Sequence, residues 1–171
     1  FKKNNPDIFQ IIISKENNQL GTAGALFKIN KYLSGNKSLI INGDTYYCGD
    51  LNLFLNESID SDLTILSSKV YFSKSYGKII FKKNNYLLDF NEKKFIFIGN
   101  VFSGYSIISN KYLVNQNYDN KKINIEDYFF KNKKLNIKVY KSNKKFIDIG
   151  TNKRFNKYNS FFSYLKLPYY L

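Results

Sequence analysis

The sequence contains no histidine and only one cysteine, Cys48. Without histidine the chain can build neither a Ser–His–Asp nor a Cys–His nucleophile, and no imidazole metal site. A single cysteine forms neither an internal disulfide nor a thiolate zinc site, and such sparing use of cysteine fits a reducing compartment. Any catalysis must therefore depend on carboxylates, lysines, backbone amide groups and a metal ion bound by oxygen atoms.

Long apolar runs are also missing, and no basic-then-apolar leader resembles a signal peptide. We therefore expect no membrane partner, and the sparing use of cysteine favours a cytoplasmic location. The chain starts at Phe1 and contains no methionine, so we expect it to be a fragment of a longer protein. A length of 171 residues with 43% hydrophobic content predicts one domain, residues 1–171, with one core.

Acidic residues are few. The chain has 13 of them and 27 basic residues, which gives a formal charge of +14. Such a charge could serve a nucleic acid or an anionic membrane. However, every basic residue except Arg154 is lysine, and the lysines occur as scattered pairs amid abundant Asn, Ile, Phe and Tyr. This composition is typical of an AT-rich coding sequence. We favour a solvated basic surface over a nucleic-acid face and rank a nucleic-acid-binding module last among the alternatives.

Hydrophobic patterning predicts strands interleaved with helices, and hence an α/β or mixed sheet. Strands are predicted over residues 8–14, 39–42, 63–70, 78–81, 87–90, 95–98, 101–109, 135–140 and 145–149. Helices are predicted over residues 51–55 and 125–131, after a Thr22 cap, and after a Thr151 cap, the last with Phe155, Tyr158, Phe162 and Leu165 facing inward. The only two alanines, Ala23 and Ala25, fall in the first turn of the Thr22 helix, which indicates little room for side chains there.

The run Leu39–Asn42 suits a strand buried on both faces, and it ends at Gly43 and Asp44. An aspartate just past the end of such a strand is either a cap or turn residue, or a ligand for a hard cation such as Mg²⁺. Both interpretations of Asp44 stay open on this stretch alone.

A second segment, Phe146–Thr151, also carries an aspartate, Asp148, at the end of a hydrophobic run beside a glycine. The two aspartates lie 104 positions apart, so only the fold can bring them together. Two carboxylates that share one Mg²⁺, with substrate phosphates completing the coordination, are a common protein arrangement for that ion. Alternatively, Asp148 caps the last helix and Asp44 is a turn residue.

Six segments, in this order, resemble the sugar-phosphate nucleotidyltransferases. They are Gln19–Ala25 (QLGTAGA), Asn42–Asp44 (NGD), Ser75–Gly77 (SYG), Phe90–Lys93 (FNEK), Phe102–Gly104 (FSG) and Phe146–Thr151 (FIDIGT). The compact size and the last segment are most similar to the heptose 1-phosphate and mannose 1-phosphate guanylyltransferases. The resemblance implies an α/β fold with a Rossmann-like, GT-A-like mixed sheet flanked by helices.

The resemblance also implies roles for single residues. Asp44 and Asp148 would hold the catalytic Mg²⁺. On the sugar side, Gly77 and Gly104 would lie near the sugar, Glu92 would accept hydrogen bonds from its hydroxyls, and Lys93 would meet its phosphate as a catalytic residue. The nucleotide would contact Leu20, Gly21, Thr22, Asn42 and Gly43.

Two departures from the family matter. Phe102 stands where the family often has Asn, which removes a sugar contact. The family's opening strand, its Gly-rich loop with Arg and its downstream lysine have no counterpart in this sequence, and no GxGxxG or Walker motif is present. We therefore expect the chain to begin at the third strand of the fold, truncated at its N-terminus, and to be inactive by itself.

For the full-length protein, the resemblance implies transfer of NMP from an NTP to a sugar 1-phosphate, giving an NDP-sugar and pyrophosphate. The attacking phosphate is already anionic, so no general base is needed, which agrees with the absence of histidine. The alternative is a degenerate, non-catalytic relative that binds a nucleotide-sugar or a partner subunit. The base, the sugar and the oligomeric state stay open.

Overall fold

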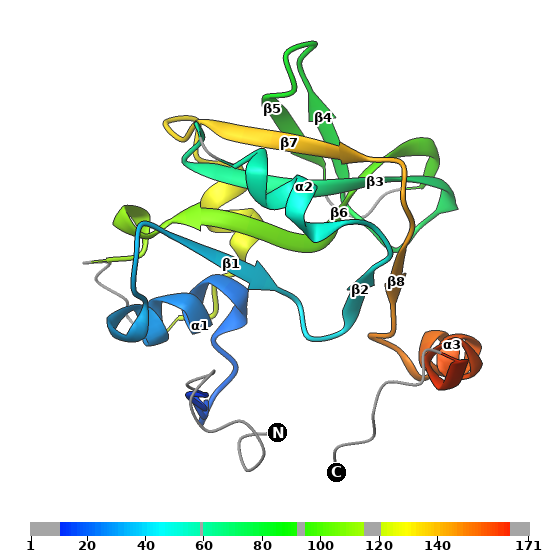
Figure 1. Cartoon of the computed structure of the whole chain (residues 1–171), viewed down its shortest axis with the longest axis horizontal. Helices are drawn as coiled ribbons and strands as arrows, with labels where there is room; N and C mark the ends of the chain where they lie inside the picture. Colours follow the sequence, from blue (N-terminus) through cyan, green and yellow to red (C-terminus); the bar gives the residue numbers. More distant parts are fainter. Residues whose placement is uncertain (1–10, 59, 92–94, 115–120, 165–171) are drawn as a thin grey trace.

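The computed structural model describes residues 11–58, 60–91, 95–114 and 121–164, the last five by backbone alone (Figure 1). Its main sheet has six strands, and a pair of short strands forms a second sheet. The main sheet consists of β1 (Lys37–Ile41), β3 (Leu63–Ser73), β4 (Lys78–Phe81), β5 (Leu87–Asn91), β6 (Ile96–Ser109) and β7 (Ile137–Ser142). The second sheet pairs β2 (Thr45–Tyr47) with β8 (Phe146–Asp148). The α-helices are α1 (Gly21–Ile29), α2 (Leu51–Asn56) and α3 (Asn152–Tyr164).

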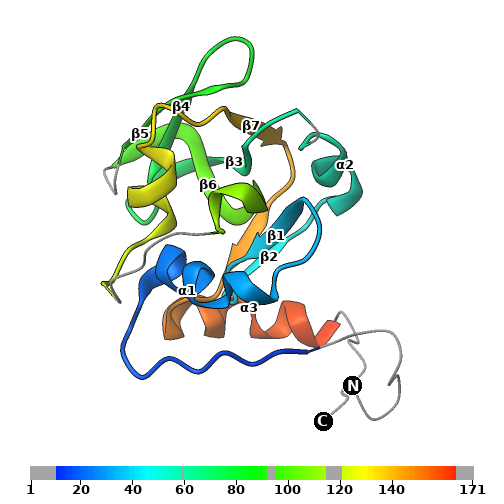
Figure 2. The ribbon, with the colours of Figure 1, turned by 90° about the vertical axis from the view of Figure 1, so that its left-hand side faces the viewer.

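The main sheet is mixed, as expected. Its strands follow the order β5-β4-β6-β3-β7, and β1 also pairs with β6. Only β3 and β7 run parallel, while the other pairs are antiparallel. The β4–β5 hairpin projects from the end of the molecule opposite to α3 in both views (Figures 1 and 2).

Strand β6 is the centre of the sheet. It runs through 14 residues and joins two predicted strands, 95–98 and 101–109, because β3 and β4 both pair with it at Asn100 and Val101. Two strands pair with the edge of β6 opposite to β3: β4 at Asn100–Val101 and β1 at Tyr105–Ser109. Between these two partners the β3–β6 register shifts, and Gly104 has a φ of +79°. A bulge of this kind bends a strand and often accompanies a functional site.

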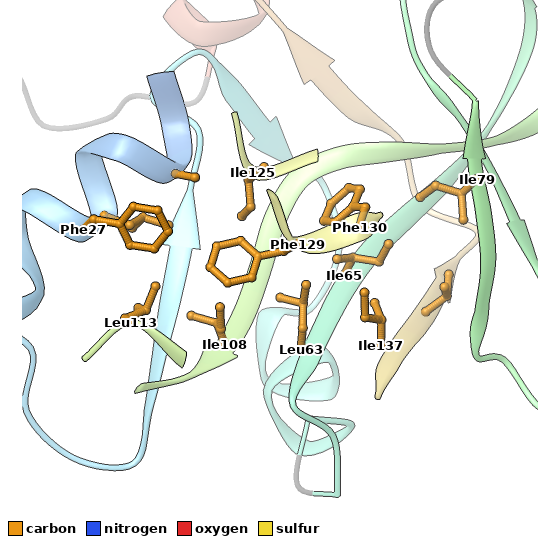
Figure 3. Packing of buried hydrophobic residues seen from close by; sticks show 13 residues of the cluster. Phe27, Leu63, Ile65, Ile79, Ile108, Leu113, Ile125, Phe129, Phe130 and Ile137 are labelled. Atoms are coloured by element: carbon orange, nitrogen blue, oxygen red, sulfur yellow. The ribbon is translucent and has the colours of Figure 1, made fainter. Parts of the chain in front are cut away.

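The sheet separates two hydrophobic clusters. Alternate residues of β3 face opposite sides, so that Leu63 and Ile65 enter the larger cluster and Leu66 the smaller one. The larger cluster contains side chains from α1 and from a five-residue π-helical turn, Glu126–Phe130 (Figure 3). The smaller cluster is covered by Phe54 of α2, which is fully buried. Asp50 caps α2 as predicted, since its carboxylate accepts a hydrogen bond from Asn52 N–H at 2.8 Å.

Several local predictions are wrong. Leu39 and Ile41 are 37% and 48% exposed, because β1 buries one face only: Ile40, which points to the opposite face, packs against the larger cluster. Residues 11–14 form no strand, and residues 8–10 lie outside the described part of the chain. In α3, Phe155 is exposed rather than inward-facing, and the side chain of Phe162 is not described. Leu165 lies outside the described residues. None of the helices in the described ranges is long and apolar enough to cross a membrane.

Thr22 does not cap α1. The helix begins one residue earlier, at Gly21, without a side-chain cap. The Thr22 hydroxyl instead accepts a hydrogen bond from Ile125 N–H at 2.8 Å. The amides of Ala23 and Gly24 donate to the Ile123 carbonyl, so a distant segment satisfies the first turn of the helix.

Candidate functional site

A cavity of about 420 Å³ opens where β1 and β4 separate along β6. The end of β1 supplies Asn42, the start of β4 supplies Gly77, and the bulge of β6 supplies Gly104. The short β2–β8 sheet closes another side with Asp44 and Asp148. Five of the predicted site residues, from four separate segments, therefore line one cavity.

The two aspartates are adjacent because β2 and β8 pair antiparallel. Thr45 lies opposite Asp148 in this ladder, and the amide of Ile149 donates to the Asp44 carbonyl at 2.8 Å. A Cβ placed on Gly150 would lie 2.5 Å from Asp44 Oδ2 and 3.2 Å from Asp148 Oδ1. The two oxygens are therefore at most 5.7 Å apart, the sum of these distances.

The Asp148 carboxylate is held on both oxygens. Its Oδ1 accepts a hydrogen bond from Gly150 N–H at 2.8 Å, and its Oδ2 pairs with Arg154 Nη1 at 2.9 Å. The Asp148 side chain is only 12% exposed, whereas Asp44 is exposed. The site thus combines one fixed carboxylate with one that solvent can reach.

Arg154 is fixed in turn by the first turn of α3. Thr151 caps this helix as predicted, because its Oγ1 accepts a hydrogen bond from Arg154 N–H at 3.3 Å. The same oxygen accepts a second bond from Arg154 Nε at 3.2 Å. Sequence reasoning did not assign Arg154 to the site, although its being the only arginine among 27 basic residues was a usable signal.

Tyr76 completes the support of Asp148. Its ring packs edge-on against Phe146, with centroids 5.2 Å apart, and lies 6.0 Å from the guanidinium carbon of Arg154. Burial raises the pKa of Tyr76 above its ordinary value, the Asp148 carboxylate raises it further, and Arg154 acts in the opposite direction. The Tyr76 hydroxyl therefore stays protonated at neutral pH and can act as a hydrogen-bond donor inside the cavity.

The donor set fits a magnesium ion. Among the described residues no group of three or more Asp, Glu, His and Cys side chains could hold a metal. Magnesium, however, commonly uses one or two carboxylates together with water and substrate phosphates. Gly150 leaves free space between Asp44 and Asp148, and a carboxylate oxygen that accepts one hydrogen bond keeps a second lone pair for a cation. Asp44 and Asp148 are the residues that would hold the ion.

Glycine at position 77 also has a structural reason, in addition to the proposed closeness to a sugar. A Cβ on this residue would collide with the ring of Phe90, which lines the same cavity. Phe90 packs in turn against Phe130 of the larger core cluster. The position therefore needs glycine whether or not a sugar lies above it.

Gly104 is expected to be the least replaceable glycine of the cavity wall. A Cβ there would lie 2.5 Å from Thr45 Oγ1 and 3.2 Å from Asn42 Nδ2, in addition to the strain of a φ of +79°. Gly35 is a matched control, because it has a similar φ of +73° but no atom within 4 Å of a Cβ. In urea denaturation, Gly35→Ala should lower the free energy of unfolding by about 1 kcal/mol. Gly104→Ala should lower it by roughly 2–4 kcal/mol.

Equal losses for the two glycine variants would show that the contact with Thr45 and Asn42 carries no energy. The account of a tightly closed wall between β1 and the bulge of β6 would then be wrong.

The nucleotide residues predicted on the α1 turn lie apart from this cavity. Gly21 and Thr22 line a shallower pocket of about 320 Å³ together with Lys122. A Cβ on Gly21 would lie 2.5 Å from the Ile123 carbonyl oxygen. Of the two alanines expected to have little room, Ala23 is fully buried, whereas Ala25 is half-buried and lines this pocket. The Leu20 side chain is buried, and its backbone carbonyl accepts a hydrogen bond from Ile123 N–H.

The remaining predicted residues have different outcomes. Gly43 is exposed in the turn after β1 and does not line the cavity. Glu92 and Lys93 lie outside the described residues, so their roles stay predictions. Phe102, identified as a departure from the family, lines the cavity and packs edge-on against Phe130 with centroids 5.1 Å apart.

Comparisons with known proteins found similar solved structures. HddC from Yersinia pseudotuberculosis is 31% identical with a TM-score of 0.81, and the match covers 94% of this chain and 70% of HddC. HddC complexed with GMP-PN is also 31% identical, with a TM-score of 0.76, covering 86% of this chain and 64% of that chain. A putative glucose-1-phosphate thymidylyltransferase from Bacillus anthracis in complex with a sucrose has a TM-score of 0.71. At 15% identity, over 85% of this chain and 62% of that one, it supports the fold alone.

The chain thus spans less than two thirds of two of these three structures. No curated protein matches it. The sequence profile of the nucleotidyl transferase family, in contrast, matches residues 2–163. This match, together with the likeness to HddC, shows that the chain belongs to the nucleotidyl transferase family.

Proposed function

We propose that the full-length protein transfers a nucleotidyl group from an NTP to a sugar 1-phosphate, releasing pyrophosphate and forming an NDP-sugar. The observation that carries this proposal is the pair of carboxylates, Asp44 and Asp148, whose oxygens approach within 5.7 Å at the wall of a cavity. Family membership supports the general reaction. The likeness to HddC, solved with GMP-PN, supports a guanine nucleotide as the donor.

The residues of the chain would act by positioning the two substrates and by holding the cation that neutralises the phosphate charge. Asp44 and Asp148 would hold Mg²⁺, and Arg154 and Gly150 N–H would keep the Asp148 carboxylate turned toward Asp44. Bound Mg²⁺ would neutralise charge on the phosphate oxygens. The sugar 1-phosphate oxygen is anionic at neutral pH, so its attack on the α-phosphorus needs no proton acceptor from the protein. Alignment of the two substrates and charge neutralisation would then supply most of the rate.

The sugar would occupy the cavity wall formed by Gly77 and Gly104. Gly77 has no side chain, so only its backbone and the Phe90 ring line this part of the cavity. The buried bulge at Gly104 brings the backbone of β6 to the cavity wall. Glu92 and Lys93 would complete this half of the site, as the family resemblance implies. A heptose or mannose 1-phosphate is the acceptor that we propose, from the same resemblance.

A substrate panel tests the proposal. The full-length protein is incubated with Mg²⁺, one of five NTPs (ATP, GTP, CTP, UTP or dTTP) and glucose, mannose or heptose 1-phosphate, and pyrophosphate release is measured. We expect GTP with a mannose or heptose 1-phosphate to give the highest rate. Tight nucleotide binding without pyrophosphate release from any pair would instead identify a non-catalytic relative and overturn the proposal.

A further inference from the structure

A second cavity, of about 480 Å³, lies where β7 leaves β3. The parallel β3–β7 ladder ends at the pair Ser68 and Ser142, but β3 continues to Ser73. The residues of β3 beyond this point, Lys69–Ser73, line one side of the cavity, and Lys145 and the first turns of α3 line another. We call this space the basic cavity.

Positive charge is in excess in the basic cavity. Its lining contains four cations, Lys69, Lys145, Arg154 and Lys157, and one carboxylate, Asp148. The carboxylate is already paired with Arg154. Within the described part of the chain no salt bridge joins any of the three lysines to a carboxylate. Three lysines that have no carboxylate partner among the described residues therefore line one cavity, an arrangement that an anionic ligand neutralises.

Aromatic rings accompany these cations. The cation–ring pairs are Lys69 with Tyr71 at 5.4 Å, Arg154 with Tyr76 at 6.0 Å and Lys157 with Tyr158 at 5.3 Å. Phe72 lines the same cavity and is 66% exposed. Exposed rings beside cations offer a stacking surface for a planar ligand as well as charge for its anionic part.

The backbone adds further polar groups. Strand β3 pairs with β6 along Lys69–Ser73, except at Phe72, but no described strand pairs with its other edge there. The backbone N–H and C=O groups that point to this edge are available as hydrogen-bond partners. The cavity thus offers three kinds of contact: charge, aromatic surface and hydrogen bonds.

We propose that the basic cavity is a second ligand site, for a nucleoside diphosphate, which adjoins the candidate active site and shares Tyr76, Asp148 and Arg154 with it. The base would stack on the exposed rings and the diphosphate would meet the lysines. The volume lies within the range of sites for a single small ligand, which favours a free nucleotide over a nucleic-acid strand. This proposal does not depend on the transferase activity.

The experiment is a calorimetric titration of the full-length protein with GDP in EDTA. The test variant carries Lys69→Gln, Lys145→Gln and Lys157→Gln, which keep most of each side chain's length and remove its charge. The control variant carries Lys82→Gln, Lys133→Gln and Lys134→Gln and has the same net charge, but none of these residues lines the basic cavity. Arg154 is left intact because it also lines the candidate site.

We expect GDP affinity to fall at least about tenfold in the test variant and to change less than about twofold in the control. Guanosine and pyrophosphate, each lacking half of the ligand, should both bind more weakly than GDP. Equal affinities in the two variants, or pyrophosphate binding as tightly as GDP, would overturn the proposal. Tighter binding of a twelve-residue oligouridylate, lost in the test variant, would show a nucleic-acid surface instead and also overturn it.

The titration is repeated in Mg²⁺ with the wild-type protein and the Asp44→Asn variant, because a nucleotide in the candidate active site would be held through the ion that Asp44 binds. GDP binding to the basic cavity should persist in the variant, because Asp44 does not line this cavity. The proposed transferase activity and the proposed second site can therefore fail independently. Loss of GDP binding in Asp44→Asn would place the nucleotide in the candidate active site and contradict a second site.

Discussion

Asp44→Asn in the full-length protein should reduce Mg²⁺-dependent pyrophosphate release by about a thousandfold or more, equivalent to roughly 4 kcal/mol of transition-state stabilisation. The substitution keeps the shape of the side chain and removes its charge. Asp44 is the exposed member of the carboxylate pair, whereas Asp148 is already neutralised in part by Arg154. Removing the Asp44 charge therefore leaves a divalent cation without its strongest free ligand. The measurement is the rate of pyrophosphate release at saturating substrates.

The matched control is Asp50→Asn. Asp50 lies six positions further along the chain and caps α2 through Asn52 N–H. Asparagine caps helices about as well as aspartate, so this variant loses one carboxylate at nearly constant stability. It should keep the wild-type rate. A rate for Asp44→Asn within about threefold of the Asp50→Asn rate would remove Asp44 from the mechanism.

Gly150→Ala is the second substitution for which we expect a large effect. The added Cβ would lie 2.5 Å from Asp44 Oδ2 and must displace that carboxylate, while both aspartates remain in the sequence. Because Gly150 does not have a left-handed φ, the backbone itself accepts alanine. We expect affinity for Mn²⁺, used as a spectroscopic substitute for Mg²⁺, to fall about 10–100-fold. Electron paramagnetic resonance of free Mn²⁺ measures this affinity without relying on turnover.

A double-mutant cycle separates this displacement from general damage. In the Asp44→Asn background, Gly150→Ala moves a side chain that has lost its charge, so the second substitution should add little further loss. Additive losses, or a fall in thermal stability that accounts for the weaker binding, would contradict the role given to Gly150.

The meeting of Asp44 and Asp148 was expected from the family resemblance, while the local pattern showed only that each lies next to a short hydrophobic run and a glycine. Those features are local, and the family order of the motifs supplied the long-range part. The lack of room around Ala23 was also predictable, since alanine is otherwise avoided in the chain. The structure explains it by the Ile123 carbonyl, which crosses the start of α1.

What the sequence did not reveal depends on contacts between distant segments. Thr22 resembles a helix cap, but its hydroxyl accepts a hydrogen bond from the N–H of Ile125, more than a hundred positions away. The role of Arg154 follows from its reach across the first turn of α3 to Asp148. The single strand β6 is similar: the sequence predicted two strands, over residues 95–98 and 101–109, yet β3 and β4 pair with opposite edges at Asn100 and Val101 and make the strand continuous.

The most direct test of the shared cation is the anomalous scattering of crystals soaked in Mn²⁺. The account predicts one strong peak within about 2.5 Å of a carboxylate oxygen of Asp44 and of a carboxylate oxygen of Asp148. A peak bound by only one of the two side chains, or no peak between them at saturating Mn²⁺, would contradict it.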